Sequence, residues 1–189
     1  MGKFFTHLTD HHREFIQRQH LFFVATAPLS DQGRINLSPK GLNSFRIFSD
    51  QQVGYADLVG SGNETSAHLL ENARITFMFC AFDGYPLILR LYGTGRVILP
   101  SAPDWENYAP QFALFPGTRQ LIVADIDKVQ TSCGFGVPYF DFVGDRDMHQ
   151  KWCTSKGPEG LEAYVQEKNT ESLDGLPTHW GQRLGTAKK

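Results

Sequence analysis

Residues 53–72, VGYADLVGSGNETSAHLLEN, decide the predicted fold and carry its most informative motif. The apolar run from Val53 to Leu58 predicts a β-strand, and the pattern from Thr65 to Asn72 predicts a short amphipathic helix. Glycines between a strand and a helix leave backbone N–H groups pointing into one space, at the positive end of the helix dipole. Such a turn accepts a phosphate readily.

The turn Gly60-Ser61-Gly62 is the candidate for this phosphate site. The side chains of Ser61, Asn63 and Thr65 would add neutral donors, and Lys40, between Pro39 and Gly41, would supply a positive charge. A second interpretation needs no ligand, because Ser61-Gly62-Asn63-Glu64 has the S-x-x-E form of a capping box. The sequence leaves both interpretations open.

Two common nucleotide-binding motifs do not fit this turn. The third glycine of the dinucleotide fingerprint is missing, and the predicted strands do not alternate with crossover helices. No G-x-x-x-x-G-K-[ST] sequence occurs. Neither a Rossmann domain nor a P-loop domain is therefore predicted.

The sequence around this stretch predicts mainly β structure. Thr9 or Asp10 can cap a first helix that runs to about Gln19, with Phe15 and Ile16 as its apolar contacts. Six runs of strand character, separated by turn residues, follow at 21–27, 35–38, 53–58, 74–82, 87–99 and 120–129. Six strands with short turns and few helices indicate an antiparallel sheet that curls on itself.

The longest predicted strand, Leu87 to Leu99, supports this curl. Its odd positions are leucine, glycine and valine, whereas its even positions include Arg90, Tyr92, Thr94 and Arg96. One face is apolar and the other is mixed, as expected for a half-buried strand. Gly93 and Gly95 fall on the apolar face, where glycine allows a sharp bend or the close approach of another group.

Length and composition predict a single domain, 1–189, with a core at about 13–133. A loop and two helices, at 145–156 and 159–169, are expected within 134–170, and the polar tail 171–189 is expected to be flexible. The net charge of −2 excludes the electrostatic footprint of a nucleic-acid-binding protein. No run approaches the length of a signal peptide core or a membrane span, so no membrane partner is expected.

The residues that could form a metal or nucleophilic site are sparse. Cys80, Cys133 and Cys153 include no C-x-x-C pair, which excludes a disulfide framework or structural zinc site and favours a cytoplasmic location. His7 and His11 lie four residues apart, but without a partner segment they are better explained as a solvated helix surface. No metal site is predicted, and no catalytic residue is identified.

The aromatic residues fall into two groups. Most of the fifteen phenylalanines lie in predicted strands, where core packing explains them, and Cys80 is expected to be buried among them. Phe135, Tyr139, Phe140 and Phe142 instead crowd a loop after Cys133. They could seal an interface or stack on a planar ligand, and the sequence does not decide between these roles.

Three motifs in order resemble the pyridoxamine 5′-phosphate oxidase-like, FMN-binding split-barrel family over roughly residues 13–133. Residues 35–41, INLSPKG, look like the family's strand that ends in a phosphate-contacting lysine. Tyr55-Ala56-Asp57 followed by residues 61–72 looks like its next strand, flavin-phosphate turn and helix. Residues 89–93, LRLYG, are similar to its long apolar-Arg-apolar-polar-Gly strand.

The resemblance implies an antiparallel, six-stranded split β-barrel with a few short helices, which acts as a homodimer and binds FMN between subunits. It implies a cofactor site made of Asn36, Ser38, Lys40, Tyr55, Asp57, Ser61, Gly62, Asn63 and Thr65. In such a protein the flavin supplies the redox chemistry, and the chain supplies position and electrostatics.

The chain departs from the family's oxidases at several positions. Glu64-Thr65 stands where these oxidases usually have an Arg-Lys pair, so the Glu64 carboxylate is expected to point away, and Ile88 stands where they often have a flavin-contacting glutamine. Their C-terminal substrate motifs are echoed only in composition, by residues 180–184, WGQRL. The sequence therefore predicts an FMN-dependent oxidoreductase of unknown substrate. The alternatives are a non-catalytic flavin or haem binding protein and a reductase that uses deazaflavin F420.

Overall fold

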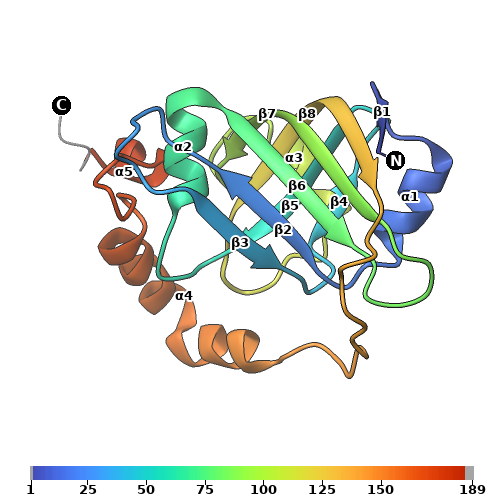
Figure 1. Ribbon diagram of the computed structural model, residues 1–189. Coiled ribbons are helices and arrows are strands. Elements are labelled where there is room, and N and C mark those ends of the chain that lie inside the picture. Colours follow the sequence, from blue (N-terminus) through green and yellow to red (C-terminus); the bar gives the residue numbers. More distant parts are fainter. Residues whose placement is uncertain (1, 186–189) are drawn as a thin grey trace.

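The computed structural model describes residues 2–185 and contains one antiparallel sheet (Figure 1). Eight strands form it: β1 (Lys3–Phe5), β2 (Phe22–Thr26), β3 (Asn36–Lys40), β4 (Phe45–Ile47), β5 (Gln52–Leu58), β6 (Arg74–Cys80), β7 (Ile88–Ile98) and β8 (Thr118–Ser132). The helices are α1 (Asp10–Gln17), α2 (Glu64–Asn72), α3 (Trp105–Tyr108), the 3-10 helix η1 (Ala109–Gln111), α4 (Met148–Lys168) and α5 (His179–Leu184).

The strand order confirms the predicted split barrel, with eight strands in place of six. The order is β3-β2-β6-β7-β8-β5-β4, and β1 adds to β8 beside this path. Each of the six predicted strands is present, whereas β1 and β4 were missed. Both missed strands are three residues long, which is too short for an alternating pattern to show.

The glycines of β7 explain how the sheet bends. A Cβ atom at Gly93 would lie 2.0 Å from the carbonyl oxygen of Asp125, so only glycine permits this approach of β8. The register between the two strands shifts at this point, because Tyr92 pairs with Lys128 and Gly93 pairs with Ile126, which leaves Asp127 as an extra residue. The predicted close approach at the apolar face is confirmed.

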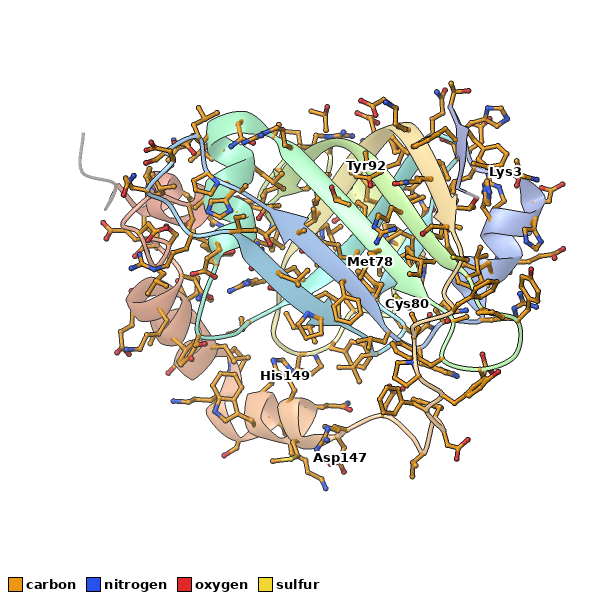
Figure 2. All side chains as sticks on the ribbon, in the orientation of Figure 1. Lys3, Met78, Cys80, Tyr92, Asp147 and His149 are labelled. Carbon is orange, nitrogen blue, oxygen red and sulfur yellow. The ribbon has the colours of Figure 1, made fainter. Side chains whose placement is uncertain are left out.

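The main core lies inside the curled sheet. Leu89 and Leu91 on β7 are fully buried there, and Phe15 of α1 and Leu69 of α2 close the open sides. The opposite face of β6 and β7 carries Met78 and Tyr92, which Figure 2 shows on the near side of the sheet. A second, smaller cluster forms around Ile98, Leu121 and Phe112. These two clusters account for the alternating pattern of the long strands.

The chain after β8 leaves the sheet and then returns to it. Residues 135–147 are almost entirely exposed, and α4 follows with a kink at Gly157 (φ 65°, ψ 171°), directly before Pro158. The kink divides α4 into halves at 148–156 and 158–168, which correspond to the two predicted helices. Figure 1 shows α4 beginning away from the sheet and running back toward α2 and α5.

The C-terminal segment packs against the start of α2. Thr178 caps α5 by accepting from the Gly181 N–H, and the His179 backbone N–H donates to the Ser66 hydroxyl of α2. The flexibility predicted for 171–189 stays a prediction, as does the single domain over 1–189, and residues 186–189 lie outside the described part of the chain.

Within residues 2–185, no helix has the length and apolar character needed to cross a membrane. In the same residues, no three His, Cys, Asp or Glu side chains gather in an arrangement that could hold a metal ion.

Candidate functional site

A buried carboxylate organises the predicted site. Asp57, at the end of β5, is 1% exposed, and Lys40 at the end of β3 donates to its Oδ1 over 2.9 Å. Arg119 and Gln120, two buried polar residues near the start of β8, donate to its Oδ2, each over 2.9 Å. We call Lys40, Asp57, Arg119 and Gln120 the Asp57 cluster. The cluster holds the Lys40 side chain at the end of β5, beside the turn that joins β5 to α2.

The charges of this cluster decide its protonation state. Burial by itself would raise the pKa of Asp57, but the positive charges of Arg119 and Lys40, with their hydrogen bonds, outweigh it and hold the pKa well below its usual range. Asp57 is therefore ionised throughout the physiological pH range. The Lys40 ammonium is less enclosed, with 23% of its side chain exposed. It can meet a ligand from the solvent side while Asp57 fixes its position.

The turn after β5 is tied to both β8 and the C-terminal segment. The Arg119 Nη1 donates to the carbonyl of Gly62 over 2.8 Å, and the Gln120 amide donates to Oδ1 of Asn63 over 2.9 Å. The Asn63 amide donates to the carbonyl of Asn169, whose own amide donates to the carbonyl of Gly60. Both polar atoms of the Asn63 side chain are therefore engaged in hydrogen bonds within the protein. Only its backbone could contact a ligand at the turn.

The start of α2 rules out one of the two interpretations of this turn. The helix begins at Glu64 with Asn63 as its N-cap, and the Asn63 side chain makes no capping hydrogen bond. The capping box proposed for Ser61 and Glu64 is therefore wrong, because Ser61 lies two residues before the N-cap. No side chain of residues 2–185 caps this helix, so the N–H groups of its first turn remain available as donors.

Glu64 places a negative charge at this turn, which opposes an anion. A Cβ atom on Gly62 would lie 2.4 Å from its Oε2, which shows that the carboxylate folds back over the turn. Its Oε1 accepts a hydrogen bond from the Leu173 N–H over 3.2 Å. The expectation that Glu64 points away from the turn is wrong, since the C-terminal segment supplies a donor beside it.

A second polar network runs from β3 to α2. The Asn36 amide donates to the hydroxyls of Thr26 and Thr65, over 3.1 and 3.0 Å, and the Ser38 hydroxyl donates to Asn36. The Thr26 hydroxyl lies 2.9 Å from Nδ1 of His68, and burial lowers the pKa of that histidine. A neutral His68 can accept a hydrogen bond from the Thr26 hydroxyl, so the hydrogen bonds of this network form without a ligand.

Sequence comparison assigns this framework to a family. The family profile described as pyridoxamine 5′-phosphate oxidase matches residues 8–133, which include every strand from β2 to β8. The chain belongs to the pyridoxamine 5′-phosphate oxidase family. The matched region contains the Asp57 cluster and the start of α2, whereas α4 and α5 lie beyond it.

Relatives and solved structures agree with this assignment. The pyridoxamine 5′-phosphate oxidase family protein ustO of Aspergillus flavus is 43% identical over 195 residues, covering 94% of this chain and 78% of ustO. A crystal structure of HupZ from Group A Streptococcus superposes with a TM-score of 0.51 at 20% identity, covering 65% of this chain and 91% of HupZ. A HupZ variant gives a TM-score of 0.52 at 20% identity, over 66% and 98% of the two chains. At this identity, HupZ supports the fold alone.

Within this family framework, the predicted site residues do not all reach the surface. Ser61 is exposed, and Asn36, Ser38 and Gly62 are half-buried around the turn. Thr65, Asn63 and Asp57 are buried. Any role that Asp57 has toward a ligand therefore acts through Lys40, which it positions.

Tyr55 is the predicted site residue farthest from solvent. Its side chain is fully buried, and its ring packs against Phe22 and Phe77. Its hydroxyl has no partner in hydrogen-bond geometry among the described residues. Burial first, and the charge of Asp57 second, raise the pKa of Tyr55 well above its usual value, although the nearby Thr65 hydroxyl acts in the opposite direction. Tyr55 therefore remains a neutral core residue.

Sequence reasoning missed the residues that complete the site from a distance. Arg119 and Gln120 stand where the predicted 120–129 strand begins, and their polar side chains within an apolar run were the available signal. Asn169 and His179 gave no signal, because they join the turn and α2 from more than a hundred residues away.

The four aromatic side chains of the loop after Cys133 are all exposed. Phe135 and Tyr139 are 77% and 78% exposed. Phe142 stacks on His20, with ring centroids 3.6 Å apart, and Phe140 packs edge-on against Phe82. These contacts line a cavity of about 510 Å³ between the start of β2 and residues 140–142. An interface role and a ligand role both stay predictions.

Proposed function

We propose that the protein binds FMN, with the phosphate at the start of α2 and beside Lys40, and that it catalyses oxidation or reduction of a small molecule. The observation that carries the proposal is the uncapped N-terminus of the nine-residue helix α2, which begins next to the turn after β5. Family membership supports the same placement, because the matched region includes both Lys40 and this turn.

The donor set fits a phosphate group. The first-turn N–H groups and the exposed Ser61 hydroxyl would donate to its oxygens, and Lys40 would add a charge-assisted hydrogen bond. The formal charges nearest the turn cancel, since Lys40 and Arg119 are balanced by Asp57 and Glu64. Binding would therefore rest on directed hydrogen bonds more than on net charge.

When bound, FMN would supply the electron and hydride chemistry. The role of this chain would be to hold and orient it. Asp57 would keep Lys40 in place at the phosphate, and the Arg119 contact to the Gly62 carbonyl would keep the turn closed against β8. The substrate class is left open, and no side chain is assigned to a proton transfer.

The first test is the absorbance spectrum of the purified protein. We expect the two bands of an oxidised flavin, with FMN recovered from the denatured protein by chromatography. A Soret band would replace the proposal with haem binding. A colourless protein that binds deazaflavin F420 but not FMN would replace it with the F420 alternative. Bound FMN that no reductant or substrate can reduce would indicate a flavin carrier.

The second test places the phosphate with two substitutions of opposite sign. Lys40→Ala removes a charge-assisted bond worth about 1.5–3 kcal/mol, so FMN affinity should fall at least ~10-fold. Glu64→Gln removes the opposing charge and keeps an oxygen for the Leu173 N–H, so affinity should rise several-fold. Lys151→Ala, at an exposed lysine of α4, is the control and should leave affinity unchanged. Equal affinities in all four proteins would exclude this turn.

The proposal extends to a homodimer with FMN at the subunit interface. The exposed aromatic segment around Phe135 and Tyr139 supports it, since these rings lack cover within one chain. If FMN binds only the dimer, it must stabilise the dimer by mass action. Dilution should then release flavin in step with dissociation, as sedimentation and flavin fluorescence can measure. A monomer that retains stoichiometric FMN would contradict the shared site.

A further inference from the structure

A cavity of about 330 Å³ lies behind the turn, on the side formed by the C-terminal helices. Val59, Thr118 and Arg119 form its sheet side, and α4 and α5 close it. We call it the α4–α5 cavity; from the two helices it is lined by Pro158, Leu161, Glu162, Val165, Gln166, Trp180, Arg183 and Leu184. These helix residues lie outside the region 8–133 that matches the family profile, whereas Val59, Thr118 and Arg119 lie inside it, so only the helix side of the cavity is beyond the matched framework.

Two kinds of surface meet in the α4–α5 cavity. Val59 and Val165 are buried apolar residues, and Leu161 is half-buried beside them. Trp180 also lines the cavity, and its indole Nε1 is buried with no hydrogen-bond acceptor among the described residues. A buried N–H that lacks an acceptor is costly. A ligand in the cavity could supply the missing acceptor.

Two guanidinium groups line the same cavity, and one of them lies beside the indole. Arg183 lies over the Trp180 ring, 5.1 Å from its centroid, and makes no hydrogen bond or ion pair within residues 2–185. Arg119 donates through Nε to Asp57 and through Nη1 to Gly62, which leaves its Nη2 without a partner in the described chain. Glu162 is the single acidic residue of the lining. The lining residues therefore have a formal charge of +1, but Arg119 is already paired with Asp57, so Arg183 is the cation left for a ligand.

We propose that the α4–α5 cavity binds a small carboxylic acid with an apolar body. The carboxylate accepts from the Trp180 N–H and from the guanidinium of Arg183, whose planar donors match a carboxylate in pairs. The apolar body packs against Val59, Leu161 and Val165. A single negative charge matches the lining better than a doubly charged phosphate, because Glu162 repels the second charge. The volume suits a ligand of this size.

The test uses octanoate as the probe and its uncharged analogue octanamide as the chemical control. Both are titrated calorimetrically into the full chain, and no step depends on a flavin. We expect saturable octanoate binding, about 10-fold tighter than octanamide, because only the acid gains the charge-assisted hydrogen bonds. Absence of saturable octanoate binding, or equal affinities for acid and amide, would overturn the proposal.

Three variants locate the binding. Arg183→Gln should weaken octanoate binding about 5- to 10-fold and leave octanamide binding nearly unchanged. Trp180→Phe keeps an aromatic ring but removes the N–H donor, and should weaken octanoate binding several-fold. Leu161→Phe reduces the cavity volume and should weaken both probes. Arg146→Gln, at an exposed arginine before α4, is the matched control and should change neither affinity.

The variants also keep the proposal testable if one of them is unstable. Thermal unfolding identifies any variant that has lost its fold, and the remaining two then decide. Octanoate affinity that is unchanged in every folded variant places the binding elsewhere and overturns the assignment.

Discussion

The Asp57 cluster and residues 134–147 differ in whether a single chain supplies the partners of their side chains. The charges of the cluster are paired within the chain, whereas the aromatic rings of residues 134–147 are left uncovered. In the cluster, Lys40 and Arg119 each contact an oxygen of Asp57, and the charges are enclosed by β3, β5 and β8. In residues 134–147 the rings of Phe135 and Tyr139 lie in solvent, and the backbone has few contacts with the sheet. The charges of the cluster are therefore paired within one chain, although the buried Oε1 of Gln120 has no hydrogen-bond partner among the described residues. The aromatic segment instead offers apolar surface that one chain leaves uncovered.

This difference separates two kinds of effect. Substitutions in the Asp57 cluster should change the free energy of unfolding of the chain itself, because they leave buried charges without partners. Substitutions in residues 134–147 should change what the chain binds or assembles with, and should hardly change its own stability. The predictions below can break or sharpen this separation.

The largest effect is expected for Asp57→Ala. Removing the carboxylate leaves the ammonium of Lys40 and the buried guanidinium of Arg119 uncompensated, which should lower the free energy of unfolding by about 3–5 kcal/mol. Denaturant unfolding measures this difference. The control is Asp125→Ala, which removes the exposed ion pair with Arg96 and should cost about 0–1 kcal/mol. Similar losses in both variants would show that the Asp57 cluster has no special role in stability.

An effect of intermediate size on the free energy of unfolding is expected when the pH changes. Titration of buried histidines, and not of Asp57, should cause it. Burial lowers the pKa of His12, His68 and His179 below the usual 6.5, with help from the charges of His11 and His7 at His12. Around and below pH 6.5 the unfolded chain then binds more protons than the folded one, so stability should decrease as pH falls through that value.

The contribution of Asp57 has a different pH window. Its lowered pKa means that its stabilisation is fully present above the ordinary value of 3.8 and is lost only in strong acid. Asp57 therefore does not contribute to changes in the free energy of unfolding between about pH 8 and pH 5, where the histidines titrate. His68→Gln should reduce the slope, since it removes one of these titrating groups. An unchanged slope in that variant would assign the pH dependence to other residues.

The smallest effect on stability is expected for Phe140→Asp. Phe140 is 62% exposed and meets Phe82 only edge-on, so the free energy of unfolding of the single chain should change by about 0.5 kcal/mol or less. If this segment lies in a subunit interface, dimer formation and flavin retention should fall together in the same variant. Sedimentation and absorbance measure the two. A loss of stability as large as that of Asp57→Ala would remove the contrast between the two regions.

The fold was predictable because most strands are long enough to show an alternating pattern. β7 has eleven residues with apolar side chains on one face, and its glycines occur where β8 approaches most closely. β1 and β4 were not predictable, since three residues give no period, and their positions depend on pairing with β8 and β5. The first helix was predictable from Thr9, which forms a capping box with His12.

The candidate site was predictable only in part. Lys40 and Thr65 could be named because they follow a predicted strand or begin a predicted helix, where short motifs are visible in the sequence, whereas Asn36 was implied only by the family resemblance. The sequence could not show that Asp57 would be shared between Lys40 and Arg119, because Arg119 lies 62 residues further along the chain. It also left open a capping box at Ser61 that the helix does not form, since α2 begins two residues after that cap requires.

The sequence by itself determined the family, the antiparallel sheet, and the turn between β5 and α2, because these depend on side-chain periodicity and on motifs within a few residues. Only the tertiary structure decided which charges meet, where Glu64 points, and how α4 and α5 enclose a cavity beside Trp180. The physical reason is the separation in sequence over which each interaction acts. Periodicity and turn chemistry act between neighbours in the chain, whereas ion pairing and burial depend on residues that only folding brings together.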